Sequence, residues 1–157
     1  MRLLFKQRMF SWFDSYDIYH EDGSTAYTVQ GRLAWGHRLE ISDAAGAPVG
    51  LVKQEVLAFL PRFALYAGDQ YLGQIKKELS FFKPVYTLDC NGWTVEGDWL
   101  GWDYSVTDSL GQEVMRASKE LLHWTDVYTI DVPDPRNALM ALMIVLAIDA
   151  ANCSGND

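Results

Sequence analysis

The sequence has few of the residues and segments that small domains use for cross-links, metal sites or membrane spans. Its 157 residues include two cysteines, Cys90 and Cys153, with no CxxC pair, so it offers no disulfide framework. The three histidines do not occur at the spacing of zinc ligands. The longest apolar run, 138–148, has eleven residues, whereas a membrane-spanning helix needs about 20. We therefore expect two free thiols, no metal or cofactor and no transmembrane span.

Basic residues are scarce as well. The chain has 13 Lys and Arg against 21 Asp and Glu, a net charge of −8, and we expect no nucleic-acid partner because phosphate contacts need clustered cations. The imbalance is uneven along the chain. Residues 1–83 hold ten basic and nine acidic residues, whereas residues 84–157 hold three and twelve. An anionic partner is therefore expected to meet the first half.

Motifs for catalysis are missing. The chain has no GxGxxG, GxxxxGK[ST] or GxSxG sequence, so nucleotide binding and α/β-hydrolase chemistry have no support. Glu96 and Asp98 form a carboxylate pair, but no pattern places two carboxylates across a cleft. His123 and Asp126 are residue types of a catalytic triad, although proximity in sequence does not define triad geometry. We expect no catalytic residues and interpret the protein as a non-enzyme.

The start of the chain and the unpaired cysteines bear on location. No apolar leader is recognisable in the residues before Lys6. Unpaired cysteines are typical of a reducing compartment. A cytoplasmic location is therefore expected.

Aromatic residues are abundant, at 13% of the chain, which favours β-structure. A sixfold pattern organises them: a lead residue is followed by large apolar residues four and six positions later. The leads are Trp12, Trp35, Phe59, Phe82, Leu100 and Trp124. Each unit reads as a strand of period two, a turn rich in Gly, Asp or Asn, and a second strand. Two strands in each of six units predict about twelve antiparallel strands.

The pattern changes after Ile130. Asp134 is expected to cap a helix that has Pro135 at its first position. The following Ala-, Leu- and Met-rich stretch favours a helix to about Ala151. This helix is apolar on every side, and such a helix is buried.

The strands and the apolar helix together predict the architecture. A sheet of about twelve strands must close to remove its edges. We therefore expect a mainly β single domain over residues 1–157, with a closed antiparallel barrel over about 3–132 around a central helix over about 135–151. Gly31 and Gly97 are expected to lie in the inward register, where a missing side chain admits the helix closely.

Three segments place large rings at adjacent or nearly adjacent positions. The rings are Trp12 and Phe13, Phe81 and Phe82, and Trp99 and Trp102. Successive strand residues point to opposite faces, so one ring of each group is expected to face outward. Outward rings would form a contact patch for a partner, a ligand or a membrane interface, or cover neighbouring strand corners.

Several short segments, in their order along the chain, resemble one protein family. They are KQRMFS at 6–11, AYxVxG at 26–31, KKxxxFFKP at 76–84, VEGD at 95–98 and the apolar helix that ends in Ile148 and Asp149. Over essentially the whole chain they resemble the small bacterial, YxjI-like members of the LOR family, within the tubby-like superfamily. The resemblance implies a twelve-stranded barrel around a central C-terminal helix. It implies no settled activity, although tubby proteins bind phosphoinositide headgroups and the related phospholipid scramblases act at membranes.

Basic residues between positions 32 and 83 are the candidate contacts for an anionic ligand. They are Arg32, Arg38, Lys53, Lys76, Lys77 and Lys83. Gathered on one barrel wall, they could hold a phosphorylated headgroup by charge-assisted hydrogen bonds. Outward lysines also keep a barrel soluble without any ligand.

Our leading interpretation is a non-enzymatic binding or scaffold module. Its sharper form adds an anionic lipid headgroup, phosphoinositide-like, or another small ligand on the first half of the chain. The alternative is a membrane-associated, phospholipid scramblase-like protein in which the apolar helix engages lipid. The ligand, the pathway and the oligomeric state are left open by the sequence.

Overall fold

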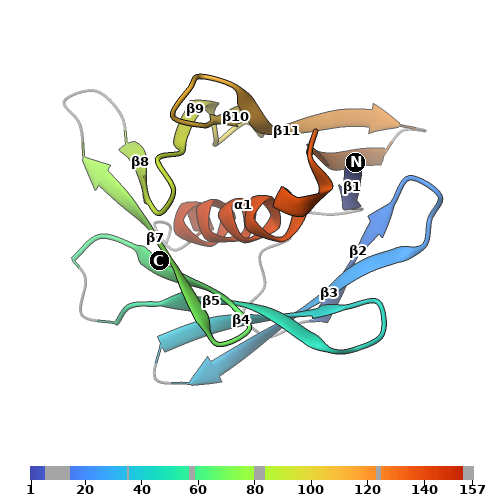
Figure 1. The fold of residues 1–157 in the computed structure, drawn as a ribbon, viewed down its shortest axis with the longest axis horizontal. Helices are drawn as coiled ribbons and strands as arrows, with labels where there is room; N and C mark the ends of the chain where they lie inside the picture. The colour runs from blue at the N-terminus through green and yellow to red at the C-terminus, as the bar shows by residue number, and fades with distance from the viewer. Residues whose placement is uncertain (6–14, 35, 57–58, 80–83, 123–124, 154–157) are drawn as a thin grey trace.

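The computed structural model describes residues 1–5, 15–34, 36–56, 59–79, 84–122 and 125–153. Within these residues, strands curve around a single helix, α1 (Ala138–Cys153) (Figure 1). The strands are β1 (Arg2–Phe5), β2 (Ser15–His20), β3 (Thr25–Ala34), β4 (Gly36–Asp43), β5 (Pro48–Gln54), β6 (Arg62–Ala67), β7 (Gln70–Leu79), β8 (Pro84–Asp89), β9 (Thr94–Asp98), β10 (Asp103–Thr107), β11 (Glu113–Leu122) and β12 (Thr125–Asp131).

The strands form one antiparallel sheet of twelve, in the order β8-β7-β6-β5-β4-β3-β2-β1-β12-β11-β10-β9. The first strand therefore pairs with the last, with Leu3 opposite Ile130. Strands β8 and β9 stand at the two ends of this order and are connected by a turn without a ladder. The predicted twelve-stranded antiparallel barrel with a C-terminal helix is confirmed, and the barrel is nearly closed, with a seam between β8 and β9.

The sixfold pattern explains the inner surface of the barrel. The residues four and six positions after each lead lie on the inner face, and pairs such as Leu39 and Ile41, or Phe63 and Leu65, are buried. The two leads that the structure describes, Phe59 and Leu100, each lie in the connection before a strand. Because successive strands run in opposite directions, these connections lie at the same end of the barrel.

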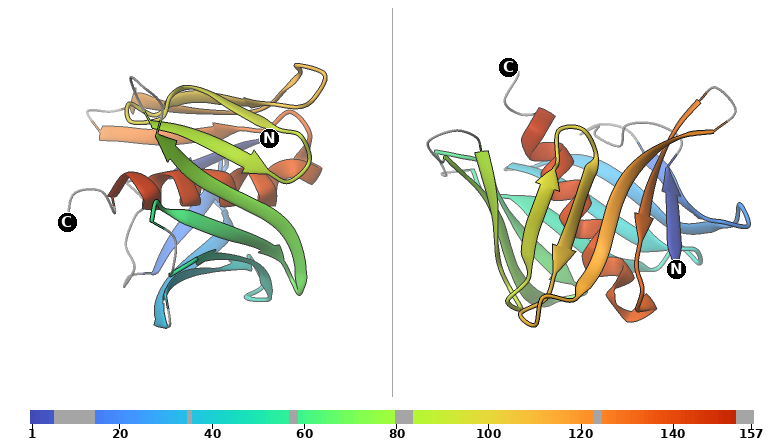
Figure 2. Two further views of the ribbon diagram at one scale, coloured as in Figure 1. Left: turned by 90° about the vertical axis from the view of Figure 1, so that its left-hand side faces the viewer. Right: turned by 90° about the horizontal axis from the view of Figure 1, so that it is seen from above.

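Alternation of strand direction gives the barrel two different ends. Tight turns after β2, β4, β6, β8 and β10 lie at the end that we call the turn end. The connections that hold the lead positions lie at the other, which we call the loop end. The helix α1 starts near the turn end and ends at the loop end, as the right-hand view of Figure 2 shows.

The helix α1 fills the interior of the barrel. Its first turn is a 3₁₀ helix over Pro135–Asn137, capped by the side chain of Asp134, which accepts a hydrogen bond from the backbone N–H of Arg136 at 3.0 Å. Every side chain from 141 to 151 is buried. The predicted cap and the predicted burial of the helix on all sides are both confirmed.

The prediction that Gly97 admits the helix is wrong. Gly97 is exposed and has φ +121°, and a Cβ there would lie 2.6 Å from the carbonyl oxygen of Asp103 on the adjacent strand β10. The close neighbour is therefore a strand. Gly50 of β5 does meet the helix, because its Cβ would lie 3.1 Å from Cδ1 of Leu139. Gly31 does lie in the inward register, opposite buried Leu39.

The prediction of an outward ring is wrong for the third aromatic group. Trp99 and Trp102 are both buried, because residues 99–102 form a turn in which Trp102 has φ +56° and strand alternation does not apply. The Trp102 ring packs against Phe5 and Tyr128, with centroid distances of 6.2 and 4.8 Å. The other two ring groups lie outside the described residues.

Candidate functional site

Basic side chains gather on the outside of strands β3 to β7. Arg32 lies opposite Arg38, and Arg38 lies opposite Lys53. Arg62 lies opposite Lys76 on the next pair of strands. The strand neighbours of these residues, such as Leu39, Val52 and Ile75, are buried, so by alternation the basic residues face outward. We call these five residues the basic wall.

Three carboxylates on the same strands and connections neutralise part of the basic wall. The pairs are Arg32 with Glu40 at 2.7 Å, Arg62 with Glu55 at 3.8 Å and Lys76 with Glu78 at 3.6 Å. Arg38 and Lys53, which are direct cross-strand neighbours, form no ion pair within the described part of the chain. Like charges directly opposite each other destabilise a strand pair. The two residues are therefore the part of the wall that an added anion would stabilise most.

The Arg38 side chain is also incompletely hydrogen bonded. Its Nε atom is buried and has no hydrogen-bond partner among the described residues. Leaving a buried donor unsatisfied costs about 1–3 kcal/mol, and more for a charged group. A guanidinium presents its N–H groups in a planar fork that matches phosphate and carboxylate oxygens. An anion at Arg38 would therefore satisfy both charge and hydrogen bonding.

Arg38 stands at one end of a groove on the outer face of β4 and β5. The groove has a volume of about 400 Å³, which falls in the usual range for small-ligand sites of about 300–1,000 Å³. Its lining includes Arg38, Glu40, Ser42, Leu51, Gly68 and Asp69. Arg38 is the cationic end, whereas Asp69 of the β6–β7 turn is the acidic end. Glu40 between them is engaged by Arg32.

The structure places the six basic residues predicted from the sequence in different parts of the barrel. Arg32, Arg38, Lys53 and Lys76 come together on the basic wall. Lys77 does not join them, because it lies opposite buried Tyr86 in the same register as buried Ile75 and therefore belongs to the inner face near the loop end. Lys83 lies outside the described residues.

The sequence interpretation missed Arg62. Arg62 begins β6 and faces outward opposite Lys76, within the basic wall. A signal was present, because Lys53 and Arg62 flank the same connection between two predicted strands. Residues that flank a hairpin connection lie near each other across the strand pair. The basic residue before this connection therefore indicated that the basic residue after it belongs to the same surface.

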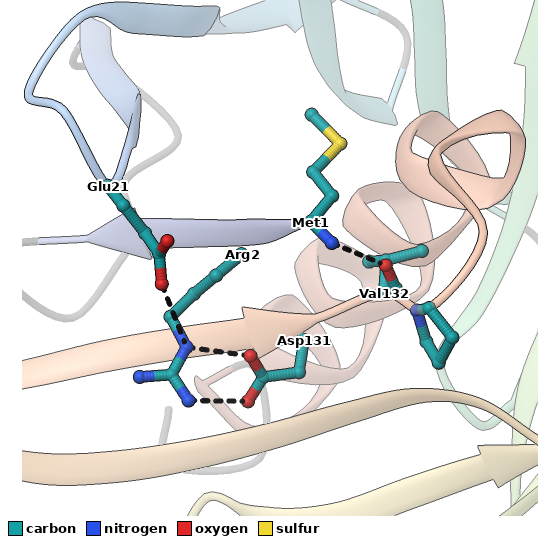
Figure 3. Close-up of a pocket in the computed structure, with 6 residues that line it drawn as sticks. Met1, Arg2, Glu21, Asp131 and Val132 are labelled. Carbon is teal, nitrogen blue, oxygen red and sulfur yellow. Dashed lines mark hydrogen bonds and ion pairs between the residues drawn. The ribbon is translucent and has the colours of Figure 1, made fainter.

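A second hollow, of about 520 Å³, lies at the turn end beside β1 and β12 (Figure 3). Its polar groups already bind one another. The Arg2 guanidinium contacts Asp131 at 2.7 and 3.2 Å and Glu21 at 3.7 Å, and its hydrogen bond to Asp131 raises the pKa of Arg2. The α-amine of Met1 donates to the carbonyl of Val132 at 3.0 Å. These contacts fasten the first strand to the last, and we assign the hollow a structural role.

Polar groups inside the barrel gather towards the loop end. Asp149 of α1 is 4% exposed. Burial and the charge of Asp149 together raise the pKa of Tyr16 and of Tyr104. Nearby, the Tyr86 hydroxyl donates to Asn152 at 2.5 Å and the Asn152 amide donates to the carbonyl of Trp99 at 3.3 Å. Asn152 at the end of α1 thus bridges β8 to the connection that follows β9.

The Cys90 thiol, which forms no disulfide, should react slowly. Burial, and to a lesser extent the charge of Asp89, raises its pKa to about 11. Because the thiolate is the reactive form, alkylation of Cys90 by iodoacetamide at pH 8 is expected to be about 100-fold slower than that of an unperturbed thiol. The rate should rise with pH up to about 11. Site-resolved mass spectrometry of the labelled protein, with N-acetylcysteine as the reference thiol, measures this, and a reference-like rate would contradict it.

The raised pKa of Cys90 also sets a direction for stability. The folded thiol stays protonated to a higher pH than the unfolded thiol, so its contribution is complete below about pH 9 and is lost as pH rises through about 11.

The described residues contain no group of three or more His, Cys, Asp or Glu side chains arranged to hold a metal ion. No helix among them is long and apolar enough to cross a membrane.

Comparison with known proteins gives three consistent results. The sequence model of the LURP-one-related family matches residues 1–149. The uncharacterized protein YxjI of Bacillus subtilis (strain 168) is 28% identical over 151 residues, which cover 95% of this chain and 92% of that protein. A crystal structure of a protein from Arabidopsis thaliana superposes with a TM-score of 0.65 at 16% identity, over 94% of this chain and 89% of the other. The last similarity concerns the fold.

Proposed function

This chain belongs to the LURP-one-related (LOR) family, and we propose that it is a non-enzymatic binding module for an anionic ligand, held at the Arg38 end of the outer groove. The ligand class is a phosphate or phosphorylated headgroup. The observation that carries the proposal is the pair Arg38 and Lys53, adjacent across β4 and β5 with no carboxylate on either among the described residues.

The rest of the groove supports an anion at that end. Asp69 carries the opposite charge at the other end, so an anionic group is driven towards Arg38. Ser42 supplies a hydroxyl and Leu51 an apolar surface between the two ends. A ligand whose phosphorylated end lies at Arg38 therefore fits the lining in one orientation.

The non-enzymatic part of the proposal rests on the state of the reactive groups. The pKa of Cys90 and the pKa values of Tyr16 and Tyr104 are all raised, chiefly by burial, so these groups stay protonated and weakly nucleophilic near neutral pH. The scramblase-like alternative requires α1 to leave the barrel. Residues 141–151 are buried inside the barrel, so we propose the binding role and not the scramblase-like role.

Ligand binding is expected to raise the thermal unfolding temperature, because a ligand that binds only the folded state stabilises it by mass action. The probes are inorganic phosphate and inositol trisphosphate, titrated at low salt. Replacing Arg38 and Lys53 together by glutamine should weaken binding of the trisphosphate by about 10- to 100-fold, since a hydrogen bond to a charged group contributes about 1.5–3 kcal/mol. Calorimetric titration gives the affinities.

The matched control is Arg116→Gln. Arg116 lies on β11, away from the groove in strand order, and pairs with Asp103 and Glu113. Arg116→Gln removes one positive charge without touching the groove, and it is compared with Arg38→Gln alone, which removes one positive charge at the groove. The affinity of Arg116→Gln for the trisphosphate should equal that of the wild type, whereas the affinity of Arg38→Gln should fall. No shift with either probe would refute the anionic ligand, and an equal loss in Arg116→Gln would reduce the effect to net charge.

A further inference from the structure

The connection between β5 and β6 carries an apolar residue with almost no protein contact. Phe59 is 97% exposed, and Val56 in the same connection is 60% exposed. Burying a phenylalanine side chain is favourable relative to leaving it in water. An isolated Phe at a protruding position is therefore a feature whose stabilisation depends on something outside the chain.

The base of this connection carries two cations and the carboxylate of Glu55, which pairs with one of them, Arg62. The backbone N–H of Glu55 bonds to the carbonyl of Arg62 at 2.9 Å, so the two strands stay together up to the point where the connection leaves them. Lys53 and Arg62 stand on either side of that base, and Arg38 is next to Lys53. Phe59 thus projects beyond a group of cations at the loop end.

Two carboxylates in the described part of the chain lie on this side of the loop end, and both are paired. Glu55 pairs with Arg62 and Glu78 pairs with Lys76. The tight turns at the opposite end of the barrel carry Asp22, Asp43, Asp69 and Asp108, and Asp98, Asp103 and Asp126 belong to the β9–β12 side. Because Arg38 and Lys53 form no ion pair among the described residues, the local charge on the β3–β7 side of the loop end is positive in spite of the net charge of −8.

We infer that the β5–β6 connection docks this protein on an anionic lipid bilayer, with Phe59 entering the interface and Lys53 and Arg62 contacting headgroups. The inference rests on the proposed function, because it names the source of the anionic ligand. An aromatic ring beside cations is the composition that interfacial anchors use, and each cation near an anionic leaflet contributes about 1 kcal/mol.

Among the described residues, the arrangement of exposed apolar side chains at the loop end favours a bilayer over a protein partner. A stable protein interface buries about 1,200–2,000 Å² around an apolar core. The exposed large apolar residues described at the loop end are instead separate: Val56 and Phe59 on one connection, Leu100 after β9 and Leu121 near the end of β11. A fluid bilayer accepts a single protruding ring, whereas a folded partner needs a continuous complementary patch.

Co-flotation of the full chain with lipid vesicles tests the inference. The vesicles are phosphatidylcholine alone and phosphatidylcholine with about 30% phosphatidylserine. We expect binding to the anionic vesicles at low salt, loss of binding at high salt because screening shortens the reach of the charges, and no binding to the neutral vesicles. Phe59→Ser should lower the partition coefficient about tenfold, from the loss of one partly buried ring.

Leu110→Ser is the matched control. Leu110 is 83% exposed in the β10–β11 turn at the opposite end of the barrel, so this change removes a comparable exposed apolar side chain and should leave the partition coefficient unchanged. Both variants should keep the wild-type unfolding temperature, because neither side chain is buried. Equal binding of Phe59→Ser and wild type would overturn the inference, and so would equal binding to neutral vesicles.

The inference and the proposed function fail in different ways. Binding of soluble inositol trisphosphate without binding to vesicles would overturn the bilayer docking and leave the groove intact. Vesicle binding that depends on Phe59, with no binding of the trisphosphate, would refute the groove and support the docking. No binding in either assay would overturn both.

Discussion

Ile144→Asp is expected to leave the chain unfolded. Ile144 is fully buried in the middle of α1, between the β-strands that surround the helix. An uncompensated carboxylate in such a place costs several kcal/mol or more, and the whole stability of a domain is about 5–15 kcal/mol. Circular dichroism and amide hydrogen exchange measure the result, which should show no protected helix.

The volume-conserving change Ile144→Leu is the control for this position. Swaps of this kind usually cost less than about 1.5 kcal/mol, so the variant should fold. A native-like spectrum and native-like exchange protection in Ile144→Asp would show that the middle of α1 reaches solvent. That outcome would contradict the helix-filled barrel.

Gly97→Ala is expected to destabilise the protein by about 3 kcal/mol or more, because it combines backbone strain with a steric clash. The φ of +121° is one that L side chains rarely adopt, and the added Cβ would lie 2.6 Å from the carbonyl oxygen of Asp103 and 2.8 Å from Cα of Tyr104. Both neighbours are backbone atoms of β10, so neither can rotate away. The ladder between β9 and β10 would have to separate.

Gly46→Ala separates the two contributions. Gly46 also has a positive φ, +84°, but nothing lies within 4 Å of its Cβ position, so this variant has the backbone strain alone and should lose about 1–2 kcal/mol. Chemical denaturation of both variants gives the comparison. Equal losses at the two positions would mean that β10 yields to the added methyl group, against the close approach described here.

Local sequence patterns predicted the architecture because local physics determines it. The inward residues recur at fixed offsets from each lead. A helix that is apolar on every side has no polar face to expose to solvent and is therefore buried. The burial of Phe63 and Leu65, for example, is predicted by their positions four and six residues after Phe59. The cap at Asp134 is likewise a matter of a few adjacent residues.

The predictions from the sequence were wrong where tertiary packing determines the outcome. Gly97 and Gly50 both lie in strands, and only the path of α1 and the approach of β10 determine which of them meets the helix. Trp102 adopts a positive φ in a turn, and strand alternation cannot foresee that exception. Seam closure likewise depends on Asn152, whose partners, Tyr86 and Trp99, are 66 and 53 positions away.

The candidate site was predicted in part. Arg38 and Lys53 were identified as basic residues, yet their isolation from carboxylates depends on register, because Glu40 reaches Arg32 and Glu55 reaches Arg62. The inward register of Lys77 could be predicted from the sequence, since Lys77 follows Ile75 by two positions and so shares its face. The groove itself is a property of curved neighbouring strands and has no local signature.

The pairing of β1 with β12 has a consequence for biosynthesis. A polypeptide emerging from the ribosome would hold eleven strands before β12, the second partner of its first strand, exists, and the apolar helix that fills the barrel follows later still. Until then the inward faces of the strands have nothing to cover them. Nascent chains of this protein therefore expose apolar strand faces for a long interval, in which they are open to aggregation and to chaperones.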